Sequence, residues 1–442
     1  MRGAVVGRRR RRAVIALQFR TPTQLRMPIT PETFDTFLRC TTKSHLTFNG
    51  IVGVPSEFSQ SHAYIGQMYK QKGREHLCSV VGDHQWHTGT PDLRSLESLR
   101  YRLIFDYVVS LPEIHARLDA LEENRIVRDG RHCPYIPIRF VPEEKLTKYD
   151  KLLLAFDALA FSQVCGKAPQ VGRIIHGGHC ATVTVRLEPL LQKVRFLLGR
   201  IAEQQVKAVP PPLTLNKHCP ECEFRSRCRQ IAIQKDDLSL LPTLSEKERK
   251  KQNGRGIFTV LQLSYTFRSP RRSAGVLPRH QPALKALAIR KNQIHILGNP
   301  TVRLSGTPVY IDVEGDPDRD FYYLVGLRIG SCGSSAHHSY WANTPADEQT
   351  MWADCLHKVA EIADPRLVHY GAYETHFLKT MKTRYPDVEH ASLLDDLISS
   401  AQNLLSIIYP HIYFPTIGAE DEKYKAGDAH ALHQCEGTRA ER

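Results

Sequence analysis

Three clustered cysteines place the tightest constraint on how this chain can fold. Cys219, Cys222 and Cys228 form a C-x2-C-x5-C pattern among prolines and charged residues, where little could bury them as core. Three thiolates leave one position of a four-coordinate metal site unfilled, and Cys40 is the best candidate for the fourth ligand. Two alternatives remain open at this point: a structural zinc site that includes His218, and unliganded cysteines.

The chain carries a net charge of +14, and a basic surplus favours a polyanionic partner such as nucleic acid. Eight of its arginines fall within residues 1–26, so the remainder is only mildly basic. This segment could be a transit peptide or a basic arm. We favour a third interpretation, in which translation starts at Met27 and the segment precedes the true start. No apolar run of about 18 residues occurs, so we expect no membrane span. We expect a cytoplasmic protein, whose clustered cysteines bind metal rather than form disulfides.

Shifts in residue pattern predict a multidomain α/β protein. In the first half, Leu103–Val109 is apolar enough for a buried strand, and Lys151–Gln163 and Leu190–Ala202 have the periodicity of amphipathic helices. We expect four parts: a basic extension at 1–26, a first domain at 27–235, a helical connector at 236–300, and an incomplete α/β domain at 301–442. The connector is expected to hold two short helices around a glycine turn, the first of which starts near Ser245 with Glu248 in its first turn.

The strongest catalytic signal is the segment Pro308–Gly315, PVYIDVEG. In a strand, alternate residues share a face, so Asp312 and Glu314 point away from the apolar residues between them. Two carboxylates on one strand face can hold a divalent ion such as Mg²⁺ or Mn²⁺. Phe321–Gly330 is expected to be the antiparallel neighbour. The alternative is a solvated edge strand with polar alternation.

A second acidic position follows in LVHYGAYETHFLKTM, which starts at Leu367. Leu367–Tyr370 is predicted to be a short strand, and a helix is predicted to start near Ala372. Glu374 would then lie in the first turn of that helix, where it can face the carboxylates of the preceding strand.

These segments resemble the RecB-like putative nucleases that carry a YprB-type ribonuclease H-like domain of the DEDD exonuclease class. The resemblance covers roughly residues 28 to 416 and is specific at the cysteines, at IDVEG, at HYGAYE and at IYPHIYFPT. It implies an α/β fold: a RecB-like PD-(D/E)XK nuclease domain followed by a ribonuclease H-like domain. It also implies that the cysteines hold a 4Fe-4S cluster, as in RecB-like nucleases of the AddB type, with zinc as the alternative. The implied residues are Cys40, Cys219, Cys222 and Cys228 for the cluster, and Asp312, Glu314 and Glu374 for Mg²⁺ or Mn²⁺.

The first domain departs from the RecB-like pattern. That pattern needs an aspartate on one strand and an acid-x-lysine on the next. Asp119 could supply the aspartate and Gln163 a downstream glutamine, but the strand Tyr135–Phe140 offers no acid-x-lysine. We therefore expect a degenerate nuclease scaffold that serves as a platform for nucleic acid.

The end of the chain is shorter than the family pattern. Tyr424 and Asp428 fit its last motif, which would make Asp428 the final metal ligand, unless the short match arises by chance. The function expected overall is metal-dependent, 3'–5' exonuclease-like hydrolysis of DNA or RNA at single-stranded ends. The alternative is a catalytically inactive nucleic-acid-binding protein stabilised by its iron–sulfur or zinc site.

Overall fold

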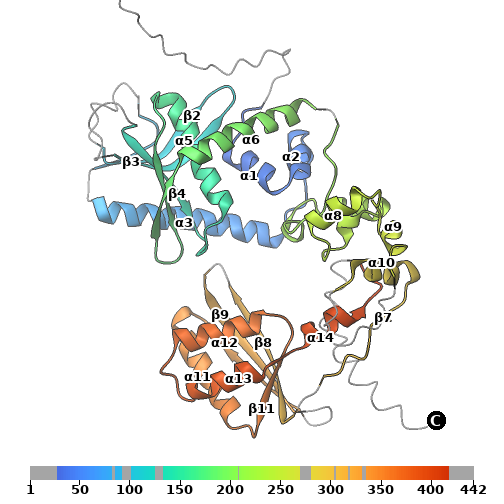
Figure 1. Cartoon of the computed structure of the whole chain (residues 1–442). Helices are drawn as coiled ribbons and strands as arrows, with labels where there is room; N and C mark the ends of the chain where they lie inside the picture. Colours follow the sequence, from blue (N-terminus) through green and yellow to red (C-terminus); the bar gives the residue numbers. More distant parts are fainter. Residues whose placement is uncertain are drawn as a thin grey trace, which may run out of the picture.

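The computed structural model describes residues 27–81, 85–91, 101–124, 133–207, 209–268, 280–302, 305–316, 319–330 and 335–417. Figure 1 shows an N-terminal region around one sheet, a connector of short helices, and a C-terminal region around a second sheet. Both regions combine helices with a sheet of mixed strand direction, so the predicted α/β class is confirmed. The predicted basic extension and Asp428 lie outside the described residues.

The N-terminal sheet has six strands in the order β1-β2-β3-β4-β5-β6. Strands β2, β3 and β4 form an antiparallel meander, and β5 then pairs in parallel with β4 after the helical crossover α5. The predicted strand at 103–109 corresponds to β2. The strands are β1 (Trp86–Thr88), β2 (Leu103–Ser110), β3 (His115–Glu123), β4 (Tyr135–Val141), β5 (Val171–His176) and β6 (Ala181–Arg186).

Helices cover both faces of this sheet. Helices α1, α5 and α6 bury their apolar side chains against one face, and the long helix α3 packs on the other. A capping box at Thr147 starts α5, and the left-handed Gly166 ends it. The two helices predicted from the sequence are thereby confirmed as α5 and α6. The helices are α1 (Pro31–Arg39), α2 (Thr41–Phe48), α3 (Glu57–Val81), α5 (Lys148–Cys165), α6 (Glu188–Val206) and α7 (Arg225–Gln234).

A buried ion pair joins α5 to β4. Asp157 is only 1% exposed, and one of its oxygens lies 2.6 Å from Nη1 of Arg139. Burial disfavours the charged carboxylate more than Arg139 favours it, which raises the pKa of Asp157 from 3.8 to about 6.

This shift should make folding stability depend on pH. Between pH 3.8 and about 6 the folded state keeps a proton on Asp157 that the unfolded state has released. The contribution of Asp157 to the free energy of unfolding should therefore fall as the pH rises through this window. Denaturant titrations of the wild type and of Asp157→Asn should show the variant gaining relative stability from pH 4 to pH 6. A difference that does not change with pH would contradict the assignment.

The connector is built from short helices with well-defined caps. Ser245 and Thr259 each form a capping box, at the starts of α8 and α9, where the sequence predicts two helices around a glycine turn. Its elements are α8 (Glu246–Asn253), α9 (Val260–Ser264), α10 (Pro282–Lys291) and β7 (His295–Ile296). Strand β7 pairs with β13 (Ile412–Tyr413), so the connector packs against the end of the described chain.

The C-terminal sheet has five strands in the order β10-β9-β8-β11-β12. Strands β8, β9 and β10 are antiparallel neighbours, whereas β11 and β12 run parallel to β8. The predicted strands at 308–315, 321–330 and 367–370 correspond to β8, β9 and β11. The strands are β8 (Thr307–Asp316), β9 (Phe321–Ile329), β10 (Ala336–Trp341), β11 (Pro365–His369) and β12 (Gln402–Asn403).

The helices of this region pack on one face of the sheet. Val309, Ile311 and Val313 of β8 are buried in a core with α11, α12 and α13. The helix predicted near Ala372 corresponds to α12. The helices are α11 (Glu348–Ala360), α12 (Tyr373–Arg384), α13 (Leu394–Ser400) and α14 (Leu404–His411).

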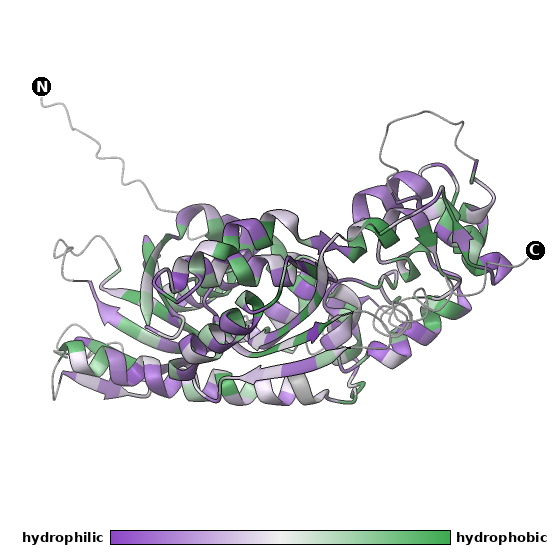
Figure 2. Cartoon of the chain, turned by 90° about the horizontal axis from the view of Figure 1, so that it is seen from below, coloured by the Kyte–Doolittle hydropathy of each residue, from purple (hydrophilic) through white to green (hydrophobic). Residues whose placement is uncertain are grey.

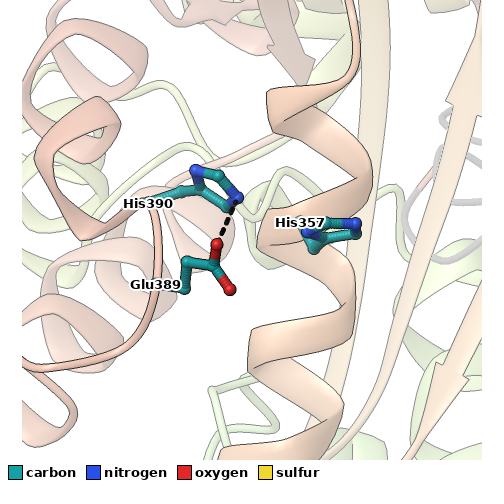
Figure 3. Close-up of side chains that lie close together, drawn as sticks. All are labelled: His357, Glu389 and His390. Carbon is teal, nitrogen blue, oxygen red and sulfur yellow. Dashed lines mark ion pairs between the residues drawn. The ribbon is translucent and has the colours of Figure 1, made fainter.

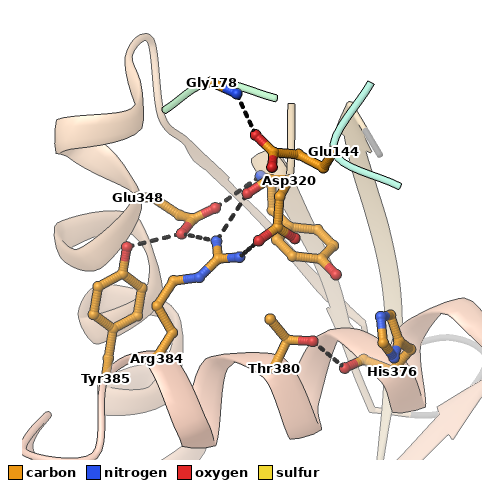
Figure 4. A network of polar contacts seen from close by, with 9 residues as sticks. Glu144, Gly178, Asp320, Glu348, His376, Thr380, Arg384 and Tyr385 are labelled. Atoms are coloured by element: carbon orange, nitrogen blue, oxygen red, sulfur yellow. Dashed lines mark hydrogen bonds and ion pairs between the residues drawn. The ribbon is translucent and has the colours of Figure 1, made fainter. Parts of the chain in front are cut away.

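A buried carboxylate fixes the position of α11. Glu348 is 2% exposed and accepts hydrogen bonds from the backbone N–H of Tyr322, from Arg384 Nη1 and from the Tyr385 hydroxyl. Arg384 is also paired with Asp320, as Figure 4 shows. Because its bonds are all made within the fold, Glu348 joins β9, α11 and α12 and serves the structure rather than a reaction.

Hydropathy is mixed along the helices. Figure 2 shows hydrophilic residues interspersed with hydrophobic ones on the long helices. None of the described helices has the length and apolar content needed to cross a membrane.

Candidate functional site

All four predicted cysteine ligands line one small pocket. Cys40, Cys219, Cys222 and Cys228 surround it together with Leu213 and Phe224, which supply an apolar wall. Cys40 lies between α1 and α2. Cys219 begins the 3-10 turn Cys219–Glu221, Cys222 directly follows that turn, and Cys228 lies in the first turn of α7. The fold therefore brings together cysteines that are far apart in the sequence.

Backbone N–H groups point at the cysteine sulfurs. The Lys43 N–H donates to Cys40 Sγ at 3.3 Å, and the Asn216 N–H donates to Cys219 Sγ at 3.2 Å. Such hydrogen bonds stabilise thiolate charge and are among the interactions that tune metal–thiolate centres. The bond to Cys40 is also the N-cap hydrogen bond of α2.

Further contacts hold the two segments against each other outside the pocket. Lys43 Nζ lies 2.7 Å from Glu223 Oε2, and the Val54 N–H donates to the Glu223 carbonyl at 3.0 Å. Asn216 Nδ2 donates to the Arg39 carbonyl at 3.2 Å. The approach of Cys40 to the cysteine cluster therefore does not depend on the sulfurs alone.

Burial of the pocket favours the neutral, protonated form of its cysteines. Burial, followed by the neighbouring thiols Cys222, Cys219 and Cys40, raises the pKa of Cys228 to about 11. Burial also raises the pKa values of Cys219 and Cys222. Without a bound cation these cysteines are therefore protonated at neutral pH, and a metal would have to displace their protons in order to bind.

The spacing of the sulfurs bears on which metal the pocket suits. A tetrahedral zinc site with Zn–S bonds of about 2.3 Å places its sulfurs about 3.8 Å apart. Among the described residues, no three of these cysteines have sulfurs within 4.8 Å of one another. His218 does not line the pocket. The described cysteine sulfurs therefore do not form a preformed four-coordinate site for a single ion.

The two predicted strand carboxylates share an open face of the C-terminal sheet. Asp312 and Glu314 are exposed on β8, while the residues on either side of Asp312 are buried, which confirms the predicted alternation. On the neighbouring strand Gly326 stands opposite Asp312. Because glycine has no side chain, the space beside the Asp312 carboxylate stays open.

Glu374, unlike Asp312 and Glu314, is buried in the fold. It is in the first turn of α12, as predicted, but it is only 5% exposed, and its Oε2 lies 3.5 Å from Nδ1 of His369. Neither of these two buried atoms has a hydrogen-bond partner. Within the described part of the chain, Glu374 does not form a three-ligand group with Asp312 and Glu314. Its role as a metal ligand stays a prediction that requires its side chain to move.

Tyr373 is a neighbour of the carboxylate strand that sequence reasoning did not single out. Burial, and then the charges of Tyr322 and Glu314, raise the pKa of Tyr373 to about 12, so its hydroxyl remains a proton donor at neutral pH. This hydroxyl lies over Gly315, where an added Cβ would come within 2.6 Å of it. Gly315 of IDVEG therefore makes room for the hydroxyl of Tyr373, the second tyrosine of HYGAYE.

This close approach gives a test at one position. Gly315→Ala should destabilise the C-terminal region by about 1–3 kcal/mol, because the new methyl group would collide with the Tyr373 hydroxyl. Adding Tyr373→Phe should recover part of the loss, although the contact with the Phe321 carbonyl at 2.9 Å remains. Urea unfolding of the single and double variants measures both effects. An alanine variant as stable as the wild type would refute the contact.

The third candidate site is a cleft between α3 and the N-terminal sheet, with a volume of about 480 Å³. Asp119 lies in it, with Oδ1 2.7 Å from Lys70 Nζ and Oδ2 accepting from the Phe140 N–H at 3.0 Å. Gln163 lies near the end of α5, exposed, and does not line the cleft. The structure therefore does not bring Gln163 to Asp119.

Sequence reasoning missed the other charged residues that line this cleft with Asp119. Asp106, on the neighbouring strand β2, has a positive φ of 56°, which is unusual for a residue within a strand. Its carboxylate lies 3.0 Å from Arg117 and 3.6 Å from Arg74. Lys70 and Arg74 come from one helix, four residues apart, which is the only signal in the sequence that could have pointed to them.

The chain matches no protein-family model and has no significant match among curated proteins.

Proposed function

We propose that this chain is a metal-dependent nuclease whose catalytic ion is held by Asp312 and Glu314. The observation that carries the proposal is the placement of these two exposed carboxylates on β8, the central strand of a sheet ordered β10-β9-β8-β11-β12. This strand order, with β9 antiparallel and β11 parallel to β8, supports the proposal of a ribonuclease H-like domain. The IDVEG and HYGAYE segments, through which the chain resembles DEDD exonucleases, lie on β8 and at the start of α12.

Carboxylate oxygens are suited to Mg²⁺ or Mn²⁺, and an ion bound here would supply an activated water and charge neutralisation at a phosphodiester. Asp312 and Glu314 would hold the ion, and the open space beside Gly326 would admit the substrate. Tyr373, protonated at neutral pH, would offer a hydroxyl near Glu314. Glu374 and Asp428 remain the proposed further ligands.

For the cysteine pocket we propose a 4Fe-4S cluster held by Cys40, Cys219, Cys222 and Cys228. Two observations support this choice: four cysteines line one pocket with an apolar wall, and backbone N–H groups donate to the sulfurs of Cys40 and Cys219. Such a centre would join α2 to α7 and stabilise the N-terminal region, in which β2, β3, β4, α5 and β5 follow one another in the order expected of a RecB-like core.

The function can be tested with a 5'-labelled single-stranded oligonucleotide, incubated with the full chain and Mn²⁺, Mg²⁺ or EDTA. We expect shortened products with Mn²⁺ or Mg²⁺ and none with EDTA. Unshortened oligonucleotide under all three conditions would refute the proposed activity.

A second candidate is a nucleic-acid-binding protein without catalysis. Two observations favour it: Glu374 is buried against His369, and Asp119 is engaged by Lys70 rather than by a metal site. The same experiment separates the candidates, because a pure binding protein would retard the oligonucleotide in a native gel without shortening it.

A further inference from the structure

A separate cluster of ligand-type side chains lies on the helical layer of the C-terminal region. His357 is on α11, and Glu389 and His390 are in the loop that follows α12, as Figure 3 shows. One ligand atom from each lies within 4.8 Å of the others, and no other group of three in the described part of the chain meets this criterion. The cluster is on the side of the sheet opposite Asp312 and Glu314, since α11 packs against the buried face of β8.

His390 shows two features that an isolated surface histidine would not need. Its φ is 66°, a left-handed conformation that disfavours most residues other than glycine, asparagine and aspartate. Its Nε2 is buried and has no hydrogen-bond partner, although Glu389 Oε1 lies 3.5 Å away. Nε2 therefore has a long ion-pair contact to Glu389 but no hydrogen bond, which leaves it available to a further binding partner.

The surroundings of the cluster favour a cation. The centroids of the imidazole rings of His357 and His390 are 5.5 Å apart. Glu361 Oε1 lies 3.6 Å from His357 Nε2, while the other oxygen of Glu361 is bound by Lys358. Two imidazoles and one carboxylate, with a second carboxylate close by, supply the ligands of a positively charged ion.

We propose that His357, Glu389 and His390 form a binding site for a first-row transition metal ion of the Zn²⁺ type. Imidazole nitrogen suits zinc, nickel and copper, whereas Mg²⁺ prefers oxygen ligands in octahedral geometry. Three protein ligands leave a coordination position for water or for a fourth ligand. The bound ion fastens α11 to the loop between α12 and α13.

The test is a calorimetric titration of the full-length protein with Zn²⁺ at neutral pH. Wild type should bind one zinc ion more per chain than His357→Ala or His390→Asn, and excess Mg²⁺ should not displace it. Asparagine is chosen at 390 because it tolerates the left-handed backbone. Zinc bound in the cysteine pocket is common to all the proteins and cancels in the difference.

His376→Ala provides the matched control, because His376 is an exposed histidine on α12 outside the cluster. It should bind as much zinc as the wild type. His357 is 60% exposed, so its loss should leave the fold intact, which circular dichroism can verify. Equal zinc stoichiometry and affinity in the wild type and both cluster variants would overturn the proposal. That result would not bear on the proposed nuclease site, which lies on the opposite face of the sheet.

Discussion

Asp312→Asn is expected to abolish metal-dependent shortening of a single-stranded oligonucleotide while leaving the protein folded. Asparagine keeps the shape of the side chain but removes the negative charge that would bind the ion. Losing a catalytic ion should lower the cleavage rate by about 10³-fold or more, which corresponds to about 4 kcal/mol of transition-state stabilisation. Because Asp312 is exposed, its substitution should hardly change the free energy of unfolding.

The matched control is Asp354→Asn. Asp354 is an exposed aspartate of the same region, but it lies on α11, in the layer that covers the other face of the sheet. The Asp354→Asn variant should cleave the oligonucleotide at the wild-type rate. Cleavage by Asp312→Asn at that same rate would remove Asp312 from the mechanism.

The second large effect is expected at the cysteine pocket. Cys222→Ser and Cys40→Ser should each lose the bound metal, because both cysteines line the same pocket although they come from different segments. Structural metal centres can contribute about 10 kcal/mol of apparent stability. These variants should therefore unfold at a clearly lower temperature than the wild type. Iron, sulfide and zinc analysis of anaerobically purified protein, with thermal unfolding, measures both effects.

Cys78→Ser is the control for the loss of a thiol as such. Cys78 is partly buried on α3 and lies outside the pocket. Its metal content and melting temperature should stay close to those of the wild type. About four irons per chain in the wild type would support the cluster, zinc would leave a metal-bound pocket of another kind, and a chain free of both metals would refute the metal centre.

Local patterns in the sequence were sufficient for much of the fold. The alternation around Asp312 predicted the exposed carboxylates on β8, because a strand has only two faces. Cys40 was the predicted fourth ligand of the cysteine cluster, and it lines one pocket with the other three cysteines, although its role as a ligand stays a prediction. Ser245 and Glu248 marked the start of α8 because a capping box is a local signal.

Contacts set by tertiary packing could not be predicted in this way. Glu374 was expected to face the strand carboxylates, but its side chain is buried beside His369, which lies on β11. The pairing of Asp119 with Lys70 depends on how α3 crosses the sheet, which no short pattern encodes. His357 and His390 likewise meet only because α11 packs beside a loop that is distant in sequence.

The most direct test of the central claim is to count Mn²⁺ ions bound to the open face of β8, from the electron paramagnetic resonance signal of free Mn²⁺. The wild type should bind at least one Mn²⁺ ion per chain that the double variant Asp312→Asn/Glu314→Gln does not bind. Ions held elsewhere, at the cysteines or at His357, remain in both proteins and cancel. Identical Mn²⁺ binding by the two proteins would contradict a metal site at Asp312 and Glu314.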